Sequence, residues 1–370
     1  MDHMTVRADT FSRVLNRLMT DSGFPGIQCA ISRGDEPPLV FSWGRVSNEP
    51  DATPVSRETY FDLASLTKVV TTYPRVMGLL ESNAINLETE VGTILDGCSD
   101  WLSRVPLWRL LNHTSGLASH VEYYRDISKN DIPTLSFVHH KARIINDIRF
   151  RPSDYDMGTE QKYSDLGFIL LGEIADQFTT LNGLAQEEAL PFHSATEIHS
   201  RESQRTGFGN DTYAATEVCP WRNRLLQGEV HDDNCWLMGG SAGHAGQFGN
   251  IDDVHAYGQG VLAHYHHQTS PFRYDPQKLR MSLSTRYRGS GGSHRLGWDT
   301  VSATGSSTGK HFSTQSFGHL GFTGTSLWID PEHKVVATIL SNRVCPSRDR
   351  AGIKMLRPQL HDAMWELLHT

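Results

Sequence analysis

Strand-like segments in this chain lie near its two ends and are scarce in between. Near the beginning, Gly26–Arg33 and Leu39–Val46 flank a turn segment that contains glycine and proline, which predicts two paired strands. Near the other end, three further runs predict strands, at Leu296–Val301, Phe322–Ile329 and Val335–Leu340. The simplest architecture joins the two ends of the chain in one sheet.

Helical spacing of apolar residues accounts for much of the remaining chain. It predicts helices at Ser65–Leu80 and Asp165–Phe178, and Asn250 is suited to cap a third helix that runs to about His264. A last helix is expected over about residues 351–368. We therefore expect a sheet with helices on it, and a mostly helical middle segment that packs beside it as a subdomain.

The charge balance and the apolar pattern exclude several classes of protein. The 370 residues include 42 acidic and 34 basic side chains, a formal net charge of -8, which argues against a nucleic-acid partner. No run approaches the roughly 18 uninterrupted apolar residues of a membrane-spanning helix. The five cysteines are scattered and odd in number, so neither a disulfide framework nor a zinc knuckle is expected.

The first residues bear on the expected compartment. They lack the basic segment followed by an apolar segment that marks a secretory leader. A cytoplasmic location is therefore the default expectation. If Asp2–Met4 is a cloning remnant, a leader has been removed and a periplasmic location is expected instead.

The strongest candidate for catalysis is Ser65-Leu-Thr-Lys68, at the start of a predicted helix. Residues at positions i and i+3 of a helix share a face, so the amine of Lys68 is expected beside the hydroxyl of Ser65. The helix dipole and burial both disfavour a charged lysine, so a neutral Lys68 would accept the serine proton. The alternative is a serine that only caps the helix, with an exposed lysine. A second Ser-x-x-Lys, Ser307–Lys310, is interpreted as part of a solvated loop.

Another serine, Ser241, lies in Gly239-Gly-Ser-Ala-Gly243, which fits the nucleophile pattern of α/β-hydrolases. That pattern needs a strand directly before the serine and a helix directly after it. The preceding Cys235–Met238 is short and glycines continue to Gly249, which favours a flexible loop. An α/β-hydrolase built on Ser241 is kept as an alternative.

His231, Asp232 and His244 carry groups that bind metals, but their spacing matches no established zinc site. A metal site on these residues is therefore not expected, and an acyl-enzyme chemistry on Ser65 would require neither a metal nor an organic cofactor. The role of these three residues is left open by the sequence.

Four segments occur in the order and at the spacing of a known superfamily, namely Ser65–Lys68, Leu110-Leu-Asn-His-Thr-Ser-Gly-Leu117, Tyr163-Ser-Asp165 and His319-Leu-Gly321. This set resembles the serine β-lactamases and penicillin-binding proteins. It is most similar to the class C β-lactamase-like branch, which also contains D-Ala-D-Ala peptidases and carboxylesterases. The likeness covers about residues 10–368.

The resemblance implies an α/β (α+β) fold, in which an antiparallel sheet is flanked by helices and a mostly helical subdomain is inserted. Residues 1–85 and 245–370 would form a split sheet domain, and residues 86–244 would form the insert. The catalytic cleft would lie between them.

The resemblance also implies catalytic roles for three residues. Ser65 would be the acylated nucleophile and Lys68 its proton-transfer partner. Tyr163 would act as general base and acid, because a tyrosine near two cations can ionise below its usual pKa of about 10.

The third motif would supply substrate contacts at the edge of the sheet. His319 and Gly321 match this motif, and the N–H of Phe322 would complete an oxyanion hole with that of Ser65.

Two positions depart from the pattern of the superfamily. The second motif commonly ends in Asn and here ends in Asp165, which cannot donate to a substrate carbonyl. Asp165 is expected either to pair with Lys68 or to favour a cationic substrate group. The third motif begins with His319 where β-lactamases usually carry Lys, and a largely neutral histidine holds the carboxylate of a penicillin less strongly.

These observations predict a serine hydrolase that forms an acyl-enzyme on an amide or ester carbonyl. Its partner would be a small-molecule or peptide substrate, with a peptidoglycan-type D-amino-acid peptide and a small carboxylic ester nearly level as candidates. Weak β-lactam hydrolysis comes third. A non-hydrolytic penicillin-binding or sensor module on the same fold is the alternative, since a fold alone does not establish catalysis.

Overall fold

The computed structural model describes residues 3–127, 136–182, 192–194, 212–287 and 289–369. Its main sheet has six antiparallel strands in the order β2-β1-β11-β10-β9-β8. The strands are β1 (Gly26–Arg33), β2 (Leu39–Gly44), β8 (Asp299–Thr300), β9 (Phe317–Leu320), β10 (Ser326–Asp330) and β11 (Val335–Ser341). Strands from the two ends of the chain pair directly, with Ile27 opposite Ser341. The predicted antiparallel sheet made from both ends is confirmed.

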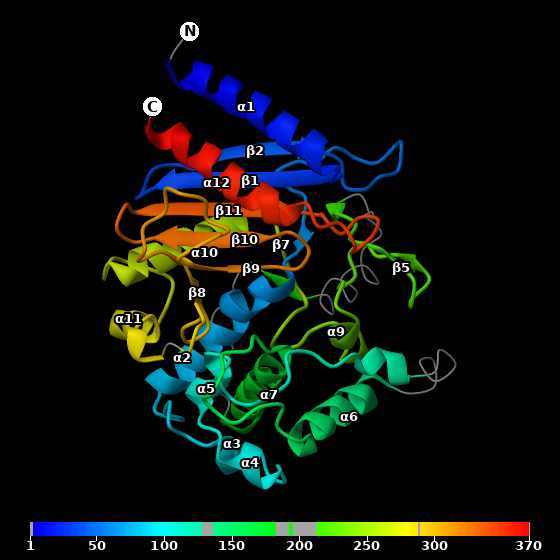
Figure 1. Ribbon diagram of the computed structural model, residues 1–370, viewed down its shortest axis with the longest axis vertical. Coiled ribbons are helices and arrows are strands. Elements are labelled where there is room, and N and C mark those ends of the chain that lie inside the picture. The colour runs from blue at the N-terminus through cyan, green and yellow to red at the C-terminus, as the bar shows by residue number, and fades with distance from the viewer. Residues whose placement is uncertain (1–2, 128–135, 183–191, 195–211, 288, 370) are drawn as a thin grey trace.

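Helices cover both faces of the main sheet (Figure 1). On one face α1 (His3–Ser22) and α12 (Ile353–His369) pack on β1 and β11, and on the other face lies α10 (Ile251–Tyr265). Successive residues of β11 therefore enter two different cores, which explains why this strand is apolar along its whole length. The predicted helix after Asn250 is confirmed as α10. The predicted cap is confirmed too, since the side chain of Asn250 accepts a hydrogen bond from the N–H of Asp253.

The middle of the chain forms a second layer below the sheet in Figure 1. Its helices are α2 (Tyr73–Glu81), α3 (Val91–Ile94), α4 (Asp100–Ser103), α5 (Leu107–Leu111), α6 (Phe137–Phe150), α7 (Asp165–Asn182) and α9 (Asp233–Leu237), and α11 (Pro276–Ser282) follows later in the chain. The short strands are β3 (Phe61–Asp62), β4 (His193–Ser194), β5 (Val218–Cys219), β6 (Arg224–Leu225) and β7 (Gln247–Gly249). None of the described helices is long and apolar enough to cross a membrane. The domain boundaries after residues 85 and 244 remain a prediction, and residues 128–135, 183–191 and 195–211 of the predicted insert lie outside the described residues.

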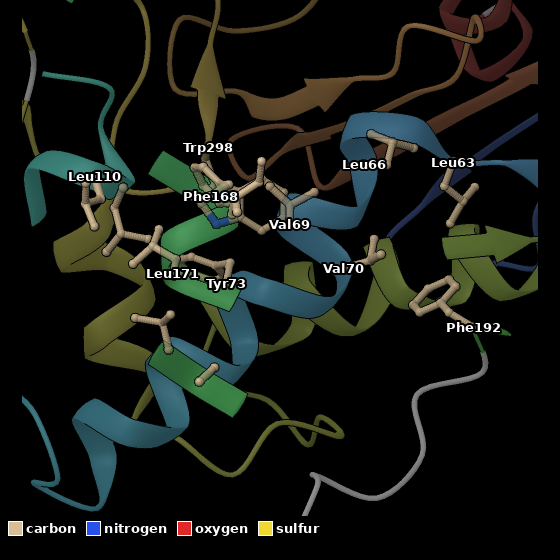
Figure 2. Close-up of a cluster of buried hydrophobic side chains, with 14 of the residues drawn as sticks. Leu63, Leu66, Val69, Val70, Tyr73, Leu110, Phe168, Leu171, Phe192 and Trp298 are labelled. Atoms are coloured by element: carbon tan, nitrogen blue, oxygen red, sulfur yellow. The ribbon is translucent and has the colours of Figure 1, made fainter. Parts of the chain in front are cut away.

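The predicted helix over Ser65–Leu80 is helical, but its first turns are not α-helical. A 3₁₀ turn covers Ala64–Leu66 and a π-helical segment covers Lys68–Thr72 before α2 begins. Figure 2 shows Val69 and Tyr73 of this stretch in a buried cluster that also contains Phe168 of α7. The apolar side of the stretch is therefore fixed by packing, while the first turn, which contains Ser65, keeps a conformation of its own.

Two strand predictions need correction. Residues 321–325 are a turn, so the predicted strand Phe322–Ile329 begins only at Ser326, and His319 lies inside the separate strand β9. The physical reason is that Gly324 has a φ of 110° and Gly321 donates to the carbonyl of Thr325, which closes a tight loop. The run Leu296–Val301 contributes only Asp299–Thr300 to the sheet.

Candidate active site

A cavity of about 700 Å³ lies where the start of the Ser65 helix faces β9, the neighbour of the short edge strand β8. Six of the seven residues predicted for the site line it, namely Ser65, Tyr163, Asp165, His319, Gly321 and Phe322. Lys68 is the seventh, and it is fully buried directly beside Ser65. The structure therefore brings together residues that are up to 257 positions apart in the chain (322 − 65).

The backbone before Ser65 adopts an uncommon conformation. Ala64 has a φ of 47°, in the left-handed region that residues with a side chain rarely occupy. The buried carboxylate of Asp62 accepts hydrogen bonds from the N–H groups of Ala64 (2.8 Å) and His231 (2.6 Å). Burial raises the pKa of Asp62, although these two N–H groups oppose the shift. The bonds hold the chain in the bend that turns Ser65 toward the cavity.

The turn 321–325 is attached to the same segment from the other side. Hydroxyl groups of Thr323 and Thr325 donate to the carbonyls of Asp62 (2.7 Å) and Leu63 (3.0 Å). A β-carbon at position 321 would lie 2.7 Å from the Leu63 carbonyl oxygen, so only glycine fits at Gly321. The peptide that carries the Phe322 N–H is thereby fixed relative to Ser65. An oxyanion hole made of these two N–H groups stays a prediction.

Lys68 makes three hydrogen bonds, one for each proton of its ammonium group. It donates to Ser65 Oγ (3.1 Å), to Asp165 Oδ1 (2.8 Å) and to the carbonyl oxygen of His244 (3.2 Å). Burial alone would lower the pKa of Lys68, but Asp165 and Tyr163 outweigh it and hold the pKa above its usual value. The expectation of a neutral lysine is therefore wrong, because it considered the helix dipole and burial, and the charge of Asp165 outweighs the effect of burial.

Tyr163 is half-buried between several rings, and Lys68 Nζ lies 4.9 Å from the centroid of its ring. Its hydroxyl is buried and faces Lys68 and Ser65. Burial raises the pKa of Tyr163, and the opposing effect of Lys68 is too small to reverse the shift. The expectation that this tyrosine ionises below pH 10 is therefore wrong for the free protein, in which Tyr163 is protonated.

Three histidines pack around the tyrosine, of which His113 and His319 are buried and His294 is half-buried. The ring centroids of His113, His294 and His319 lie 4.6, 5.4 and 5.9 Å from that of Tyr163. Burial lowers the pKa of each imidazole, so all three are neutral near pH 7. His319 Nδ1 donates to the carbonyl of Leu320 at 2.9 Å, which leaves Nε2 as an acceptor. The expectation of a largely neutral His319 is confirmed.

Asp165 is the centre of what we call the acidic wall of the cavity, formed by His120, Asp165, Asp232 and His244. Its Oδ1 accepts from Lys68, and its Oδ2 lies 3.1 Å from Nδ1 of His120. Burial raises the pKa of Asp165, but Lys68 and His120 outweigh it and hold the pKa well below its usual range. Of the two expectations for Asp165, the structure contains the pair with Lys68.

The three residues considered as metal ligands form separate pairs. His231 Nε2 lies 2.9 Å from Glu217, and His244 Nε2 lies 3.0 Å from Asp232. Asp232 also caps α9 by accepting from the N–H of Cys235 at 2.7 Å. Among the described residues, no three such side chains are arranged to hold a metal ion.

Ser241 lies in the loop between α9 and β7, and the sheets around it are antiparallel. Gly243 packs directly on Gly172 of α7, where a β-carbon would lie 2.0 Å from the carbonyl oxygen of Phe168. The glycines of this loop therefore allow a close approach to α7 and do not form a nucleophile turn. The α/β-hydrolase alternative is wrong.

A second part of the cavity, which we call the basic wall, is formed by Arg343, Lys354 and Arg357. Arg343 Nε donates to the carbonyl of Phe322 at 2.7 Å, and Arg357 donates to the carbonyls of Gly321 and Thr325, both at 2.7 Å. Both arginines are about nine-tenths buried, and no described carboxylate lies within ion-pair distance of either. Burial lowers the pKa of Arg357 to about 9.

Comparison with known proteins decides the family. The family model described as Beta-lactamase matches residues 11–360, most of the chain. The chain belongs to the β-lactamase family of serine hydrolases. A protein of Salmonella enteritidis PT4 (strain P125109), named "Putative D-alanyl-D-alanine carboxypeptidase", is 25% identical over 365 residues, which cover 87% of this chain and 80% of that protein.

Solved structures of this family have the same fold. A β-lactamase/D-alanine carboxypeptidase from Pseudomonas syringae superposes with a TM-score of 0.67 at 15% identity, over 98% of this chain and 99% of that one. A class C β-lactamase superposes with a TM-score of 0.65 at 16% identity, also over 98% and 99%. The resemblance inferred from the four motifs is confirmed.

Several residues that shape this β-lactamase-family site were not found from the sequence. Asp62 has a weak signal, because an Asp two residues before a strained position often binds its N–H. His120 has none, since its contact with Asp165 spans 45 residues. Arg343 and Arg357 also have no signal in the sequence, because nothing in their spacing shows that they are buried without an acidic partner.

Proposed function

We propose that Ser65 is the nucleophile of an acyl-enzyme mechanism and that the substrate is a D-amino-acid peptide of the D-alanyl-D-alanine type. One observation carries the proposal: Lys68 donates a 3.1 Å hydrogen bond to Ser65 Oγ at the wall of a cavity large enough for a peptide end.

The chemistry follows from this arrangement. Ser65 Oγ attacks the carbonyl carbon and its proton passes by way of the Lys68 and Tyr163 pair to the leaving atom, while the N–H groups of Ser65 and Phe322 bind the oxyanion. Tyr163 is protonated and acts as a hydrogen-bond donor to the leaving atom. The C–N or C–O bond breaks, the leaving group takes a proton, and water later releases the acyl group from Ser65.

The substrate class is supported by the basic wall and by relatives. A D-peptide ends in a carboxylate, and Arg343 and Arg357 are buried cations that lack a described acidic partner. An anionic substrate end would balance these charges. The curated relative from Salmonella carries a carboxypeptidase name.

A small carboxylic ester is the second candidate. The observation that favours it is the group of neutral imidazoles around Tyr163, which places no fixed cation at the position where β-lactamases usually carry Lys. For the same reason we rank β-lactam hydrolysis third, and a slow penicillin-binding or sensor role after it.

The test is covalent labelling of the full chain. Incubation with a fluorophosphonate or a labelled penicillin, followed by peptide mass spectrometry, should give an adduct on Ser65. Ser65→Ala should abolish labelling and turnover, whereas the matched variant Ser241→Ala should retain both. An adduct on another residue, or full activity of Ser65→Ala, would overturn the proposal.

Turnover of a substrate panel then orders the candidates. We expect D-Ala-D-Ala peptides to give the highest kcat/KM, short p-nitrophenyl esters to follow and penicillins to be slowest. A burst of acylation without steady-state turnover on every substrate would support the sensor alternative and contradict hydrolysis.

A further inference from the structure

We propose that Asp232 and Asn234 form a subsite for a primary ammonium group on the acyl portion of the substrate. We call these two residues the amine subsite. The inference rests on the proposed function, because it describes the acyl group that Ser65 would carry. It narrows the substrate class to D-peptides that have a free amine in addition to their carboxylate.

Asp232 has one carboxylate oxygen in use and one available. Its Oδ1 accepts from the N–H of Cys235 at 2.7 Å and lies 3.0 Å from His244 Nε2. No residue that the structure describes bonds to Oδ2. The Asp232 side chain is 25% exposed and lines the cavity. Oδ2 is therefore able to accept a hydrogen bond from a molecule bound there.

Asn234 supplies a second acceptor. The residue is 1% exposed and also lines the cavity. Its Nδ2 donates to the carbonyl of Val121 at 2.7 Å, which leaves Oδ1 as the accepting atom of the amide. Oδ1 is buried and has no hydrogen-bond partner within the described parts of the chain. A buried acceptor without a donor costs free energy, and a donor on a bound molecule would remove that cost.

The short helix α9 brings the two acceptors together. Asp232 directly precedes α9, and Asn234 is the second residue of this helix. The bond from Asn234 to Val121 attaches this end of α9 to the segment that carries His120, which lines the same cavity. The two acceptors therefore belong to the cavity that contains Ser65.

Asp232 also differs from other carboxylates of the cavity in its partner. Three of those carboxylates are already paired with lysine or arginine, namely Asp165 with Lys68, Asp233 with Arg348 and Glu122 with Arg125. The described partner of the Asp232 side chain is an imidazole, His244. Burial raises the pKa of Asp232, but His244 outweighs it and holds the pKa well below its usual range. Asp232 is therefore an ionised group whose second oxygen can pair with a cation.

A primary ammonium group has the chemistry that the amine subsite requires. Asp232 Oδ2 and Asn234 Oδ1 both accept hydrogen bonds and cannot donate them, so a carboxylate or phosphate would find no donor at either atom. An ammonium group has three N–H donors and a charge opposite to that of Asp232. A hydroxyl group could bond to one acceptor, but it would form no ion pair.

The basic wall determines which part of the substrate carries the amine. Arg343 and Arg357 are assigned the carboxylate, which belongs to the leaving group of a D-peptide. The amine then belongs to the portion that stays on Ser65, either at the N-terminus of the peptide or on a side chain.

The first test compares two penicillins that differ by one amine. Ampicillin carries an amino group on its acyl side chain, and benzylpenicillin lacks it. We expect ampicillin to acylate Ser65 about tenfold faster at pH 7, the effect of one charge-assisted contact. Mass spectrometry of the full chain at successive times measures both rates. Equal rates, or faster acylation by benzylpenicillin, would contradict the amine subsite.

The variant Asp232→Asn removes the charge of the subsite. Its amide oxygen can still accept from the N–H of Cys235, so the start of α9 is preserved. The preference for ampicillin should fall to less than about twofold, because the ion pair is lost. The matched control is Asp176→Asn, whose carboxylate pairs with Arg75 and Lys141 away from the cavity, and it should keep the full preference. An unchanged preference in Asp232→Asn would overturn the proposal.

The second test uses turnover and does not depend on penicillins. The substrates are the p-nitrophenyl ester of D-alanine and the same ester with an N-acetyl group. We expect Asp232→Asn to raise KM for the free-amine ester about tenfold, while KM for the acetylated ester changes less than about twofold. An equal change for both esters would indicate a structural role for Asp232 and contradict the amine subsite.

These outcomes separate this inference from the proposed function. If a fluorophosphonate labels Ser65 but neither pair of compounds shows a preference for the amine, only the amine subsite is wrong. If Ser65 is not labelled at all, the proposed function itself is wrong.

Discussion

Among the described residues, the charged groups on the acidic wall of the cavity have ion-pair or imidazole partners, whereas the buried arginines on the basic wall have no acidic partner. On the acidic wall each carboxylate has a cationic or imidazole partner, Lys68 for Asp165 at 2.8 Å and His244 for Asp232 at 3.0 Å. On the basic wall, the buried guanidinium group of Arg357 donates only to backbone carbonyls among its described contacts.

This difference indicates that the acidic wall is suited to proton transfer and the basic wall to recognition of an anionic substrate group. A paired charge can pass protons within the protein and keep its net charge constant during the reaction. A buried cation without an acidic partner is costly, as the lowered pKa of Arg357, about 9, reflects. Such a group suits recognition, because an arriving anion removes part of that cost.

Removing the cation of the acidic wall should have the largest effect. Lys68→Met keeps the length and burial of the side chain but leaves Ser65 without its proton-transfer partner. We expect kcat/KM to fall by about three orders of magnitude, within the range of lost general acid–base catalysis. Steady-state kinetics on a p-nitrophenyl ester measures this, and retention of more than a tenth of the activity would contradict the assignment.

Substitution of Glu217 tests how much stability a carboxylate contributes when it pairs with an arginine next to the basic wall. It binds Arg348 and His231, and the pKa of Glu217 is lowered to about 2 because these partners outweigh burial. A carboxylate with a depressed pKa in the folded state contributes stability above its unfolded pKa of 4.5, and that stability is lost as the pH falls toward 2. The contribution is on the order of 3 kcal/mol.

Urea unfolding at pH 6 and at pH 3 measures this contribution. The unaltered protein should lose stability between the two values, and Glu217→Gln should be less stable at pH 6 but lose less on acidification. Equal acid sensitivity of the two proteins would show that Glu217 is not the group responsible.

Substitution on the basic wall should separate substrates by charge. In Arg357→Met, KM for a D-peptide with a free carboxylate should rise about tenfold, the effect of losing one charge-assisted contact, while KM for a neutral ester changes little. Parallel measurements on the two substrates check this. A rise of the same size for both would indicate a structural role for Arg357.

Substitution of Ala64 is expected to have the smallest effect, and Ala64 belongs to neither wall. Because its φ of 47° is unfavourable for a residue with a β-carbon, Ala64→Gly should stabilise the fold by up to about 1 kcal/mol. Ala64→Val should destabilise it and reduce acylation, since a branched side chain would disturb the bend before Ser65. Thermal unfolding of both variants tests the assignment of strain.

The layout of the fold could be predicted because apolar periodicity is local. The strand Gly26–Arg33 and the helix after Asn250 were expected from that pattern and are present. The turn 321–325 could not be, because its hydroxyls bond to the carbonyls of Asp62 and Leu63, more than 250 residues away in the chain.

The site was predictable in its members but not in their ionisation. The motifs identified Ser65, Lys68 and Tyr163, and the structure brings all three together. Their charge states depend on burial and on Asp165, which lies 97 residues from Lys68. A motif records residue types, whereas a pKa depends on the three-dimensional surroundings.

The pairing of β1 with β11 has a consequence for biosynthesis. Ile27 leaves the ribosome 314 residues before its partner Ser341 (341 − 27). At roughly 5–20 residues per second, the first hairpin waits about 15–60 s for the strand that completes its sheet. During that interval the free edge of β1 is open to other chains, so production in cells should depend on chaperone supply more strongly than the stability of the finished protein suggests.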